Sequence, residues 1–433
     1  MSETRAVDDE SIRATPDEPQ PTSSTLPPVD RRFTLTTFSA FRVRPFAWLF
    51  TSAMTGTIGY EMQVVALGWL IYTLTGSAFY LGAVTTMQSI TQTGISPIGG
   101  VFADRVDRRK YIMLVRIITL PVSLGLALLI FIHHISVLDL LIAAAIFGVA
   151  FGLNGPARQA LIAQLVGKDL LMNAVSLMSG GSNLMRILGP ALAGILIGVI
   201  GVDGIYVILA VCYMMVILAM VPIPSQPPAN RASSRNMIGD LADGFSYCFQ
   251  NPNVMALLLV GTVPLFFSMP YVPLLPIFAE HIWNVGASGY GVLSAAPGVG
   301  GLIGALSVAS FSHYERKGVL IIGGVALYGI LLVGFAAAFD FPVALLCLGL
   351  AGAMGVIYTA TVSSVIQSII PNEVRGRVMS LYQMSFGISG LSALPASAIA
   401  GWVGAPETIV GCGLLTVISA LLIVWLRPSL ISI

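Results

Sequence analysis

Long runs of apolar residues recur along the chain from about Phe46 onward, separated by short breaks of polar residues, glycine or proline. Each run is close to the ~20 residues that a helix needs to cross ~30 Å of hydrocarbon. No run alternates as a barrel strand does, so the runs predict helices, which satisfy their own backbone groups in lipid. We predict about twelve spans, near 46–72, 78–101, 111–132, 136–157, 173–200, 203–222, 253–279, 286–311, 318–338, 341–367, 376–402 and 404–426.

The composition supports an all-α integral membrane protein. The 433 residues are 56% hydrophobic and only 9% charged, with a mean hydropathy of +0.88, well above the ~45–50% apolar content of soluble domains. The net charge of +1 gives no reason to expect a nucleic-acid partner. The four cysteines show no CxxC spacing, so we interpret them as packing residues and expect no metal site and no cofactor.

Two polar segments set the domain boundaries. Residues 1–45 are rich in proline, serine and acidic residues, which predicts a disordered cytoplasmic tail, and they lack the pattern of a cleaved signal peptide. The longest connection, 223–252, opens with "PIPSQPPANRASSR" and separates six predicted spans from six. It predicts a cytoplasmic linker with a short surface helix. The linker divides an N-terminal half, 46–222, from a C-terminal half, 253–433.

Lysine and arginine occur on alternate connections only. The connections near Gly76, His133, Asp203, Glu280, Asp340 and Glu407 contain neither residue. By the positive-inside rule, the basic connections and both termini are cytoplasmic, and the even number of spans agrees with this. We therefore expect a multi-pass protein surrounded by the lipid bilayer.

The two halves show traces of an internal repeat. "VGKDLLMNAVSLM" (166–178) aligns without gaps on "IPNEVRGRVMSLY" (370–382), and "GSAFY" (76–80) returns as "GASGY" (286–290) before the next apolar run. Both pairs lie at corresponding places in the two halves, which indicates duplication. Internal repeats with a site between them near the bilayer midplane are the architecture of many secondary transporters.

One cytoplasmic connection is unusually charged. "GGVFADRVDRRK" (99–110) has six charged side chains in twelve residues. Its basic residues could serve only as a topology anchor, but an anchor does not need the carboxylates Asp104 and Asp107. We therefore expect this connection to have a second role.

The same stretch resembles the loop signature of the major facilitator superfamily, G-x-L-A-D-R/K-x-G-R/K-R/K, with Asp107 in place of the usual glycine. The sequence is similar to the bacterial branch of enterobactin and multidrug exporters, of the transmembrane secretion effector type. The ordered stretches that carry this similarity are "GWLIYTLTGSA" (68–78), "GPARQALIAQLVG" (155–167), "NAVSLMSGGSNLMRILGPALAG" (173–194) and "RGRVMSLY" (375–382).

The resemblance implies the major facilitator fold, with twelve helices in two pseudo-symmetric halves, and a monomer in the bacterial inner membrane. It also implies a cytoplasmic latch. Asp104 would face the start of the eleventh span, where the helix dipole is positive, with Arg158 as a candidate partner. Such contacts would hold the cytoplasmic side closed and break when the halves rock, biasing the equilibrium by about a few kcal/mol. The expected latch comprises Gly100, Asp104, Arg105, Arg108, Arg109, Arg158, Glu373, Arg375 and Arg377.

Two arginines lie clearly within predicted spans, where a charge costs roughly 2.5–3.5 kcal/mol. Arg116 lies ~9 Å from the inner end of its span, so we expect its side chain to extend to the cytoplasmic interface. Arg186 lies near the bilayer centre and precedes Gly189, Pro190 and Gly194, which allow close approach of helices. A structural role that ties helices together and a role facing the substrate both remain open for Arg186.

Glu61 is the sole acid that falls clearly within a predicted span, away from its ends. A carboxyl group partly removed from water can load and release a proton near neutral pH, which makes Glu61 our candidate for proton coupling. A static ion pair with Arg186 and a carboxylate exposed to an outer cavity are the alternatives.

The leading function is a secondary exporter that moves an amphipathic small molecule, a drug or a siderophore, by alternating access in exchange for protons. An importer or a lipid or lysolipid transporter is the alternative within transport, and a channel is a further one. A membrane enzyme is remote, because His133 and His134 form the only suggestive polar pair. The sequence lacks a Walker P-loop, so we expect no use of ATP.

Overall fold

The structure of the 433-residue chain is a computed structural model that describes residues 36–225, 237–310 and 316–428. The chain divides into two units, Met1–Thr37 and Phe38–Ile433. Apart from residues 36 and 37, everything described here lies in the second unit. The predicted tail up to residue 35 and residues 226–236 of the linker lie outside the described residues.

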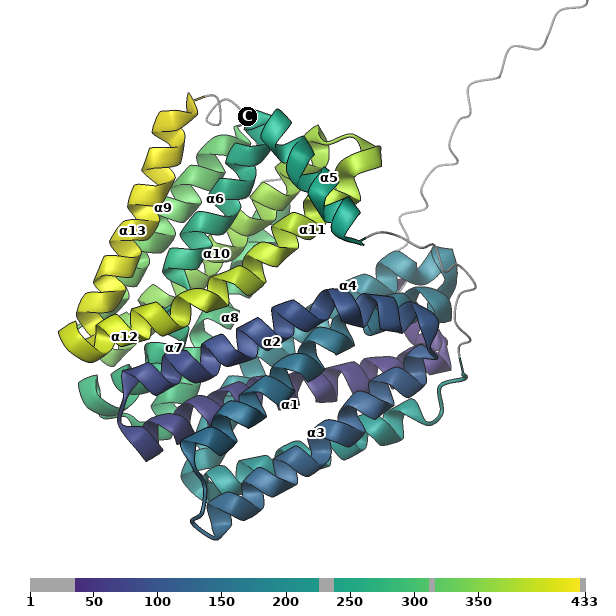
Figure 1. Ribbon diagram of the computed structural model, residues 1–433, viewed down its shortest axis with the longest axis vertical. Coiled ribbons are helices and arrows are strands. Elements are labelled where there is room, and N and C mark those ends of the chain that lie inside the picture. The colour runs from purple at the N-terminus through teal and green to yellow at the C-terminus, as the bar shows by residue number, and fades with distance from the viewer. Residues whose placement is uncertain (1–35, 226–236, 311–315, 429–433) are drawn as a thin grey trace, which may run out of the picture. The chain divides into compact units, whose positions relative to one another are not determined.

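The described part of the chain is helical throughout (Figure 1). The predicted spans match its helices in order, which confirms the all-α fold class. The elements are η1 (Thr36–Arg42), α1 (Arg44–Thr75), α2 (Ala78–Arg105), α3 (Arg108–Phe131), α4 (Val137–Met220), α5 (Met237–Gln250), α6 (Pro252–Ser268), α7 (Tyr271–Ile277), η2 (Phe278–Ile282), α8 (Gly286–Ser310), α9 (Lys317–Ala336), α10 (Phe341–Ile369), α11 (Asn372–Ser389), η3 (Gly390–Ser392), α12 (Ala393–Val403) and α13 (Ala405–Leu426).

The 84-residue helix α4 contains three of the predicted spans. Its backbone leaves the helical region at Gly167, with φ 69°, and at Gly201, with φ 74°. These positive φ values suit glycine, which has no Cβ to clash with the backbone. They divide α4 into segments 137–166, 168–200 and 202–220. The seventh span likewise consists of α6, α7 and η2, and the eleventh of α11, η3 and α12.

Length and hydropathy alone identify eight membrane-crossing stretches among the described residues, with α4 counted once. Helices α1 and α2, with 32 and 28 residues, are long enough to cross but do not belong to these eight. Polar residues such as Glu61, Gln63 and Gln88 reduce their hydropathy. The two least apolar spans of the first half thus carry Glu61, Gln63 and Gln88.

The backbone repeats the sequence similarity between the halves. Gly76, between α1 and α2, has φ 61°, and Gly286, at the start of α8, has φ 62°. Gly201 and Gly404 also have positive φ and lie before the sixth and twelfth spans. The chain therefore reverses with a left-handed glycine at corresponding junctions of the two halves.

Residues 36–45 fold, although we expected them in the disordered tail. They form η1 and the start of α1. The ring of Phe41 packs against Phe46 and Phe50, with centroids 5.7 and 4.9 Å apart. The backbone amide of Ala40 donates to Oδ1 of Asn173 over 3.0 Å. This aromatic cluster buries apolar area and so stabilises the fold of residues 36–45. The average composition of residues 1–45, which is polar, does not reveal it.

The charged hairpin between α2 and α3 turns at Asp107. The Asp107 side chain accepts a hydrogen bond from the backbone amide of Arg109 over 2.9 Å and caps α3. Its second oxygen accepts a hydrogen bond from the hydroxyl of Ser225, beyond the end of α4. An aspartate in place of the usual glycine therefore gives this loop a helix cap.

Glycines bring the two halves into backbone contact. A Cβ added to Gly194 of α4 would lie 2.6 Å from the carbonyl oxygen of Ala287 and from Cα of Gly291 in α8. A Cβ on Gly82 of α2 would lie 2.7 Å from the carbonyl oxygen of Ala393 in α12. Helix α12 lies beside α2 in Figure 1. Small residues thus permit helix approach where lipid supplies no hydrophobic driving force.

Hydrogen bonds join the halves in the same region. Thr86 Oγ1 of α2 accepts a hydrogen bond from the amide of Leu394 over 3.0 Å. Tyr72, near the end of α1, has its hydroxyl 2.9 Å from Nδ1 of His281 in η2. Together with the glycine contacts, these bonds connect α1, α2 and α4 of the first half to η2, α8 and α12 of the second. We refer to this set of contacts as the interhalf seal.

The interhalf seal predicts that replacing glycine by alanine lowers stability at Gly194 but not at Gly411. We expect Gly194→Ala to destabilise the protein by about 1–3 kcal/mol, because its Cβ has no room against α8. Gly411→Ala on α13 is the control, since no atom lies within 4 Å of its added Cβ and alanine favours a helix. Thermal unfolding in detergent should show a lower midpoint for the first variant only. Equal midpoints would mean that the halves do not depend on this approach.

The cap of α3 predicts a loss of stability in Asp107→Ala. Removing a capping side chain costs about 0.5–2 kcal/mol, so the unfolding midpoint in detergent should fall. Asp107→Asn should remain close to the unmodified protein, because its amide oxygen can accept the same bond. A fall of the same size in both variants would assign the effect to the charge of Asp107 instead of to the cap.

Candidate functional site

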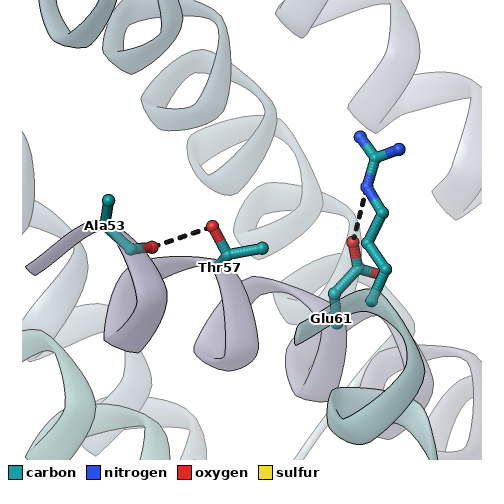
Figure 2. Close-up of polar contacts among 4 residues, drawn as sticks. Ala53, Thr57 and Glu61 are labelled. Atoms are coloured by element: carbon teal, nitrogen blue, oxygen red, sulfur yellow. Dashed lines mark hydrogen bonds and ion pairs between the residues drawn. The ribbon is translucent and has the colours of Figure 1, made fainter. Parts of the chain in front are cut away.

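Glu61 lies on α1, one helical turn after Thr57 (Figure 2). The Thr57 hydroxyl donates to the carbonyl oxygen of Ala53 over 2.8 Å and thus satisfies itself within the helix. Glu61 instead directs its carboxylate away from α1, and the dashed line in Figure 2 marks its ion pair.

The partner of Glu61 is Arg186 on α4. Oε1 of Glu61 lies 3.7 Å from Nε of Arg186, and the two side chains are 19% and 62% exposed. This distance is within ion-pair range and too long for a good hydrogen bond. The pair predicted as an alternative for Glu61 is present, and its arginine faces open space.

Gly189 allows this pair to form. A Cβ on Gly189 would lie 2.6 Å from Cβ of Glu61 and 3.3 Å from the carbonyl oxygen of Ile58. The α4 segment 168–200 can therefore lie directly against α1 at the height of the carboxylate. The next residue, Pro190, is buried, and Gly194 meets α8 one turn further on.

A cavity of about 160 Å³ opens beside the pair. It lies inside the N-terminal half, between α1, α3 and all three segments of α4. Arg116, Arg158 and Arg186 line it together with Glu61, and Tyr60 and Asn154 are among its other polar residues. We call this space the arginine cavity. Three guanidinium groups and one carboxylate thus meet within one small space of the membrane domain.

Arg116 does not extend to the cytoplasmic interface, contrary to our expectation. Its guanidinium carbon lies 5.0 Å from the centre of the Tyr213 ring, on the last segment of α4. An Nη2 atom of Arg116 would lie 3.2 Å from a Cβ on Gly56, so the side chain lies against the glycine face of α1. The cation–π contact with Tyr213 and the space beside Gly56 accommodate the guanidinium inside the protein, so the side chain does not need to reach the lipid headgroups.

A second cavity of about 270 Å³ lies between the two halves. Its lining is mainly apolar and comes from α1, α2, α7, α8, α11, η3 and α12, with Gln88 and Gln92 as its amide side chains. We call it the central cavity. Tyr60 lines both cavities, and its ring lies 4.1 Å from that of Phe151 between centroids. Tyr60 therefore lies where the charged cavity and the apolar cavity adjoin, and we refer to its contact with Phe151 as the aromatic wall.

The latch remains a prediction. The side chains of Asp104 and Glu373, and the surroundings of Gly100, lie outside what the structure describes. Among the other predicted members, Arg105 is exposed and Arg108 is buried, and Arg158 lines the arginine cavity. The backbone amide of Arg109 donates to Asp107. Arg375 donates from Nη2 to the carbonyl oxygen of Ile370 over 3.3 Å. Arg377 lies beside α5, because its Cβ would be 3.3 Å from a Cβ added to Gly244.

Sequence reasoning missed two features of the cavities. Tyr60 is one of 13 tyrosines, and nothing in the sequence distinguishes it from the others. Only the fold shows that it lines both the arginine cavity and the central cavity. We expected Arg158 at the cytoplasmic end of a span, as a partner in the latch. It lies four residues after Asn154 and therefore on the same helix face, which is the sequence signal that could have placed both in one cavity.

The described residues hold no group of three or more histidine, cysteine, aspartate or glutamate side chains that could bind a metal ion. All four cysteines are free thiols, and Cys248 and Cys412 are buried. The charged groups of the arginine cavity are its three arginines and Glu61.

Three comparisons place the chain among transporters. The profile of the transmembrane secretion effector family matches residues 35–430. The chain is 28% identical over 405 residues to the enterobactin exporter EntS of Shigella boydii serotype 4, covering 90% of this chain and 92% of that one. It is 26% identical over 311 residues to macrolide efflux protein A of Streptococcus pyogenes, covering 71% and 77%. It is 24% identical over 375 residues to the staphyloferrin A transporter of Staphylococcus aureus, covering 86% and 93%.

Solved structures agree on the fold. The nucleoside transporter NupG superimposes with a TM-score of 0.73 at 14% identity, covering 88% of this chain and 100% of that one. A bacterial homologue of the lysosomal transporter Spinster, in an inward-facing and unoccupied conformation, gives a TM-score of 0.72 at 14% identity, covering 90% and 98%. With the family match over nearly the whole described length, these findings show that the chain is a multi-pass membrane transporter that belongs to the transmembrane secretion effector family of the major facilitator superfamily.

Proposed function

We propose that the protein is a secondary exporter that carries an amphipathic small molecule out of a bacterial cell in exchange for protons. The family and the relatives support export, because the relatives are named as an enterobactin exporter and a macrolide efflux protein. The observation that carries the proposal is Glu61, a membrane carboxylate beside a cavity, in loose contact with one arginine.

Alternating access is supported by where the halves meet. The positive-inside rule places Gly76, Gly201, Gly286 and Gly404 on the outer side, and the interhalf seal lies near these junctions. A seal at the outer end corresponds to a carrier open to the cytoplasm, as the Spinster homologue is described. Substrate binding from the inside would then precede rocking of the halves and release outside.

The predicted latch would stabilise the opposite state. With the cytoplasmic ends brought together, Asp104 would meet the start of α11, whose orphan amides attract a carboxylate. Opening the interhalf seal and closing the latch would be the two parts of one movement. The protein would work as a monomer in the inner membrane, with both termini in the cytoplasm.

Glu61 is suited to carry the proton. Its side chain is 19% exposed and its carboxylate lies 3.7 Å from Nε of Arg186, so water reaches the side chain and no tight hydrogen bond holds the carboxylate. A group that must exchange protons with two sides in turn needs this access. Arg186 would stabilise the deprotonated carboxylate and would be released when the carboxylate is protonated.

Loss of the Glu61 carboxyl should uncouple transport from protons. Everted membrane vesicles are energised, the internal pH is followed with a quenched dye, and siderophores, macrolides and lysolipids are added in turn. We expect one compound to dissipate the gradient with the unmodified protein and at least tenfold more slowly with Glu61→Gln.

Glu407→Gln is the matched control, since Glu407 is exposed in the first turn of α13 and away from both cavities. Gradient dissipation that is unchanged in Glu61→Gln would remove Glu61 from the coupling step. Uptake of labelled compound without any proton signal would show a carrier that is driven by another ion.

The latch predicts slower transport by Asp104→Asn, because the amide is a weaker partner for helix amides and arginine than a carboxylate. Initial rates of uptake into everted vesicles should fall several-fold. Asp107→Asn is the matched control on the same hairpin, since its capping oxygen is kept. Equal rates in the two variants would contradict the latch.

A further inference from the structure

The arginine cavity carries more positive charge than its surroundings balance. Its described lining contains three arginines and one acid, Glu61, and its other titratable side chain is the neutral Tyr60. Three positive charges against one negative charge leave two uncompensated. Charges within a membrane domain are costly unless they are paired or solvated, so this excess calls for a function.

The three guanidinium groups lie close enough to act on one another. Arg116, Arg158 and Arg186 line the same cavity, and the charges of Arg116 and Arg186 both act on Arg158. The Nε atom of Arg116 is buried and has no hydrogen-bond partner. The Tyr213 ring partly stabilises Arg116, but an aromatic face neutralises no charge.

Arg186 offers its guanidinium to the cavity. Its side chain is 62% exposed, and its contact with Glu61 is a 3.7 Å approach to Nε alone. An arginine fork can bind a carboxylate or phosphate through two parallel hydrogen bonds, which is a stronger arrangement than this one. An incoming anion can therefore replace Glu61 as the partner of Arg186.

The volumes of the two cavities fit a substrate that has a small charged head group and a separate apolar body. About 160 Å³ is too small for a drug-sized ligand, whose pockets measure ~300–1,000 Å³. The central cavity adds about 270 Å³ of mainly apolar space on the other side of Tyr60. A molecule that passes this aromatic wall would place a charged end among the arginines and an apolar end between the halves.

We propose that the arginine cavity is an anion subsite, so that the substrate is an amphipathic anion whose carboxylate, phosphate or similar group binds Arg116, Arg158 and Arg186 and competes with Glu61 for Arg186. This inference rests on the proposed export function and specifies its substrate class. It also gives Glu61 a second effect, because the carboxylate that carries the proton is the rival of the substrate.

Matched fluorescent amphiphiles test the proposal without knowledge of the natural substrate. The probes are 1-pyrenebutyrate, the neutral 1-pyrenebutanol and the cationic pyrenebutyl-trimethylammonium, which share one apolar body. Binding to the full-length protein in nanodiscs is measured by fluorescence anisotropy, with empty nanodiscs as the background. We expect pyrenebutyrate to bind at least tenfold more tightly than the other two probes, a difference of about 1.4 kcal/mol.

The variants should move the affinity in opposite directions. Arg158→Gln and Arg186→Gln should weaken binding of pyrenebutyrate at least tenfold, whereas Arg158→Lys should keep most of it. Glu61→Gln should strengthen binding several-fold, because it removes the competing carboxylate. Arg427→Gln, at the exposed end of α13, is the control and should bind as the unmodified protein does.

Equal affinity for the anionic and cationic probes would overturn the anion subsite, and so would arginine variants that are folded by gel filtration and bind pyrenebutyrate unchanged. Weaker binding in Glu61→Gln would overturn the competition for Arg186. None of these results depends on proton flux. The proposed exporter function has its own readout in the vesicle experiment and can fail or stand separately.

Discussion

The close approach of one helix to two neighbours determines how this structure is held together. The α4 segment 168–200 meets α1 at Gly189, where Glu61 lies, and meets α8 at Gly194, where the two halves join. Lipid offers no hydrophobic gain for helix association, so van der Waals contact at small residues must supply it. Because Arg186 lies on the same segment, the ion pair and the interhalf seal are rigidly connected. A change at the pair therefore has a short mechanical path to the contact between the halves.

The charged site consists of residues that belong to the first half. Glu61 comes from α1, Arg116 from α3, and Arg158 and Arg186 from α4. The second half contributes apolar and hydroxyl side chains to the central cavity, among them Tyr290 and Ser389. In such an arrangement one half binds the polar part of a ligand, while the other supplies a surface that can move past it. Movement of the apolar surface breaks few strong interactions.

Much of the fold could be predicted from the sequence, because hydropathy and the charges of the loops act over whole helices. The twelve spans correspond to helices in the structure, and "GSAFY" and "GASGY" begin with glycines of nearly equal φ. The contacts of individual side chains could not be predicted. The aromatic contacts of Phe41 order residues placed in the tail. Arg116 turns toward Tyr213 because the third dimension brings a glycine face and a ring together, and neither lies near Arg116 in sequence.

The left-handed glycines at matching junctions point to the history of the chain. An ancestral six-helix unit that was duplicated and fused would have retained its reversals, because any side chain there strains the backbone. Elsewhere the copies were free to diverge, and the second of them contains no counterpart of Glu61 within its spans. With the proposed anion subsite in the first half, the two copies would differ in function: the first would bind the charged part of the substrate, and the second would supply the apolar surface that moves past it.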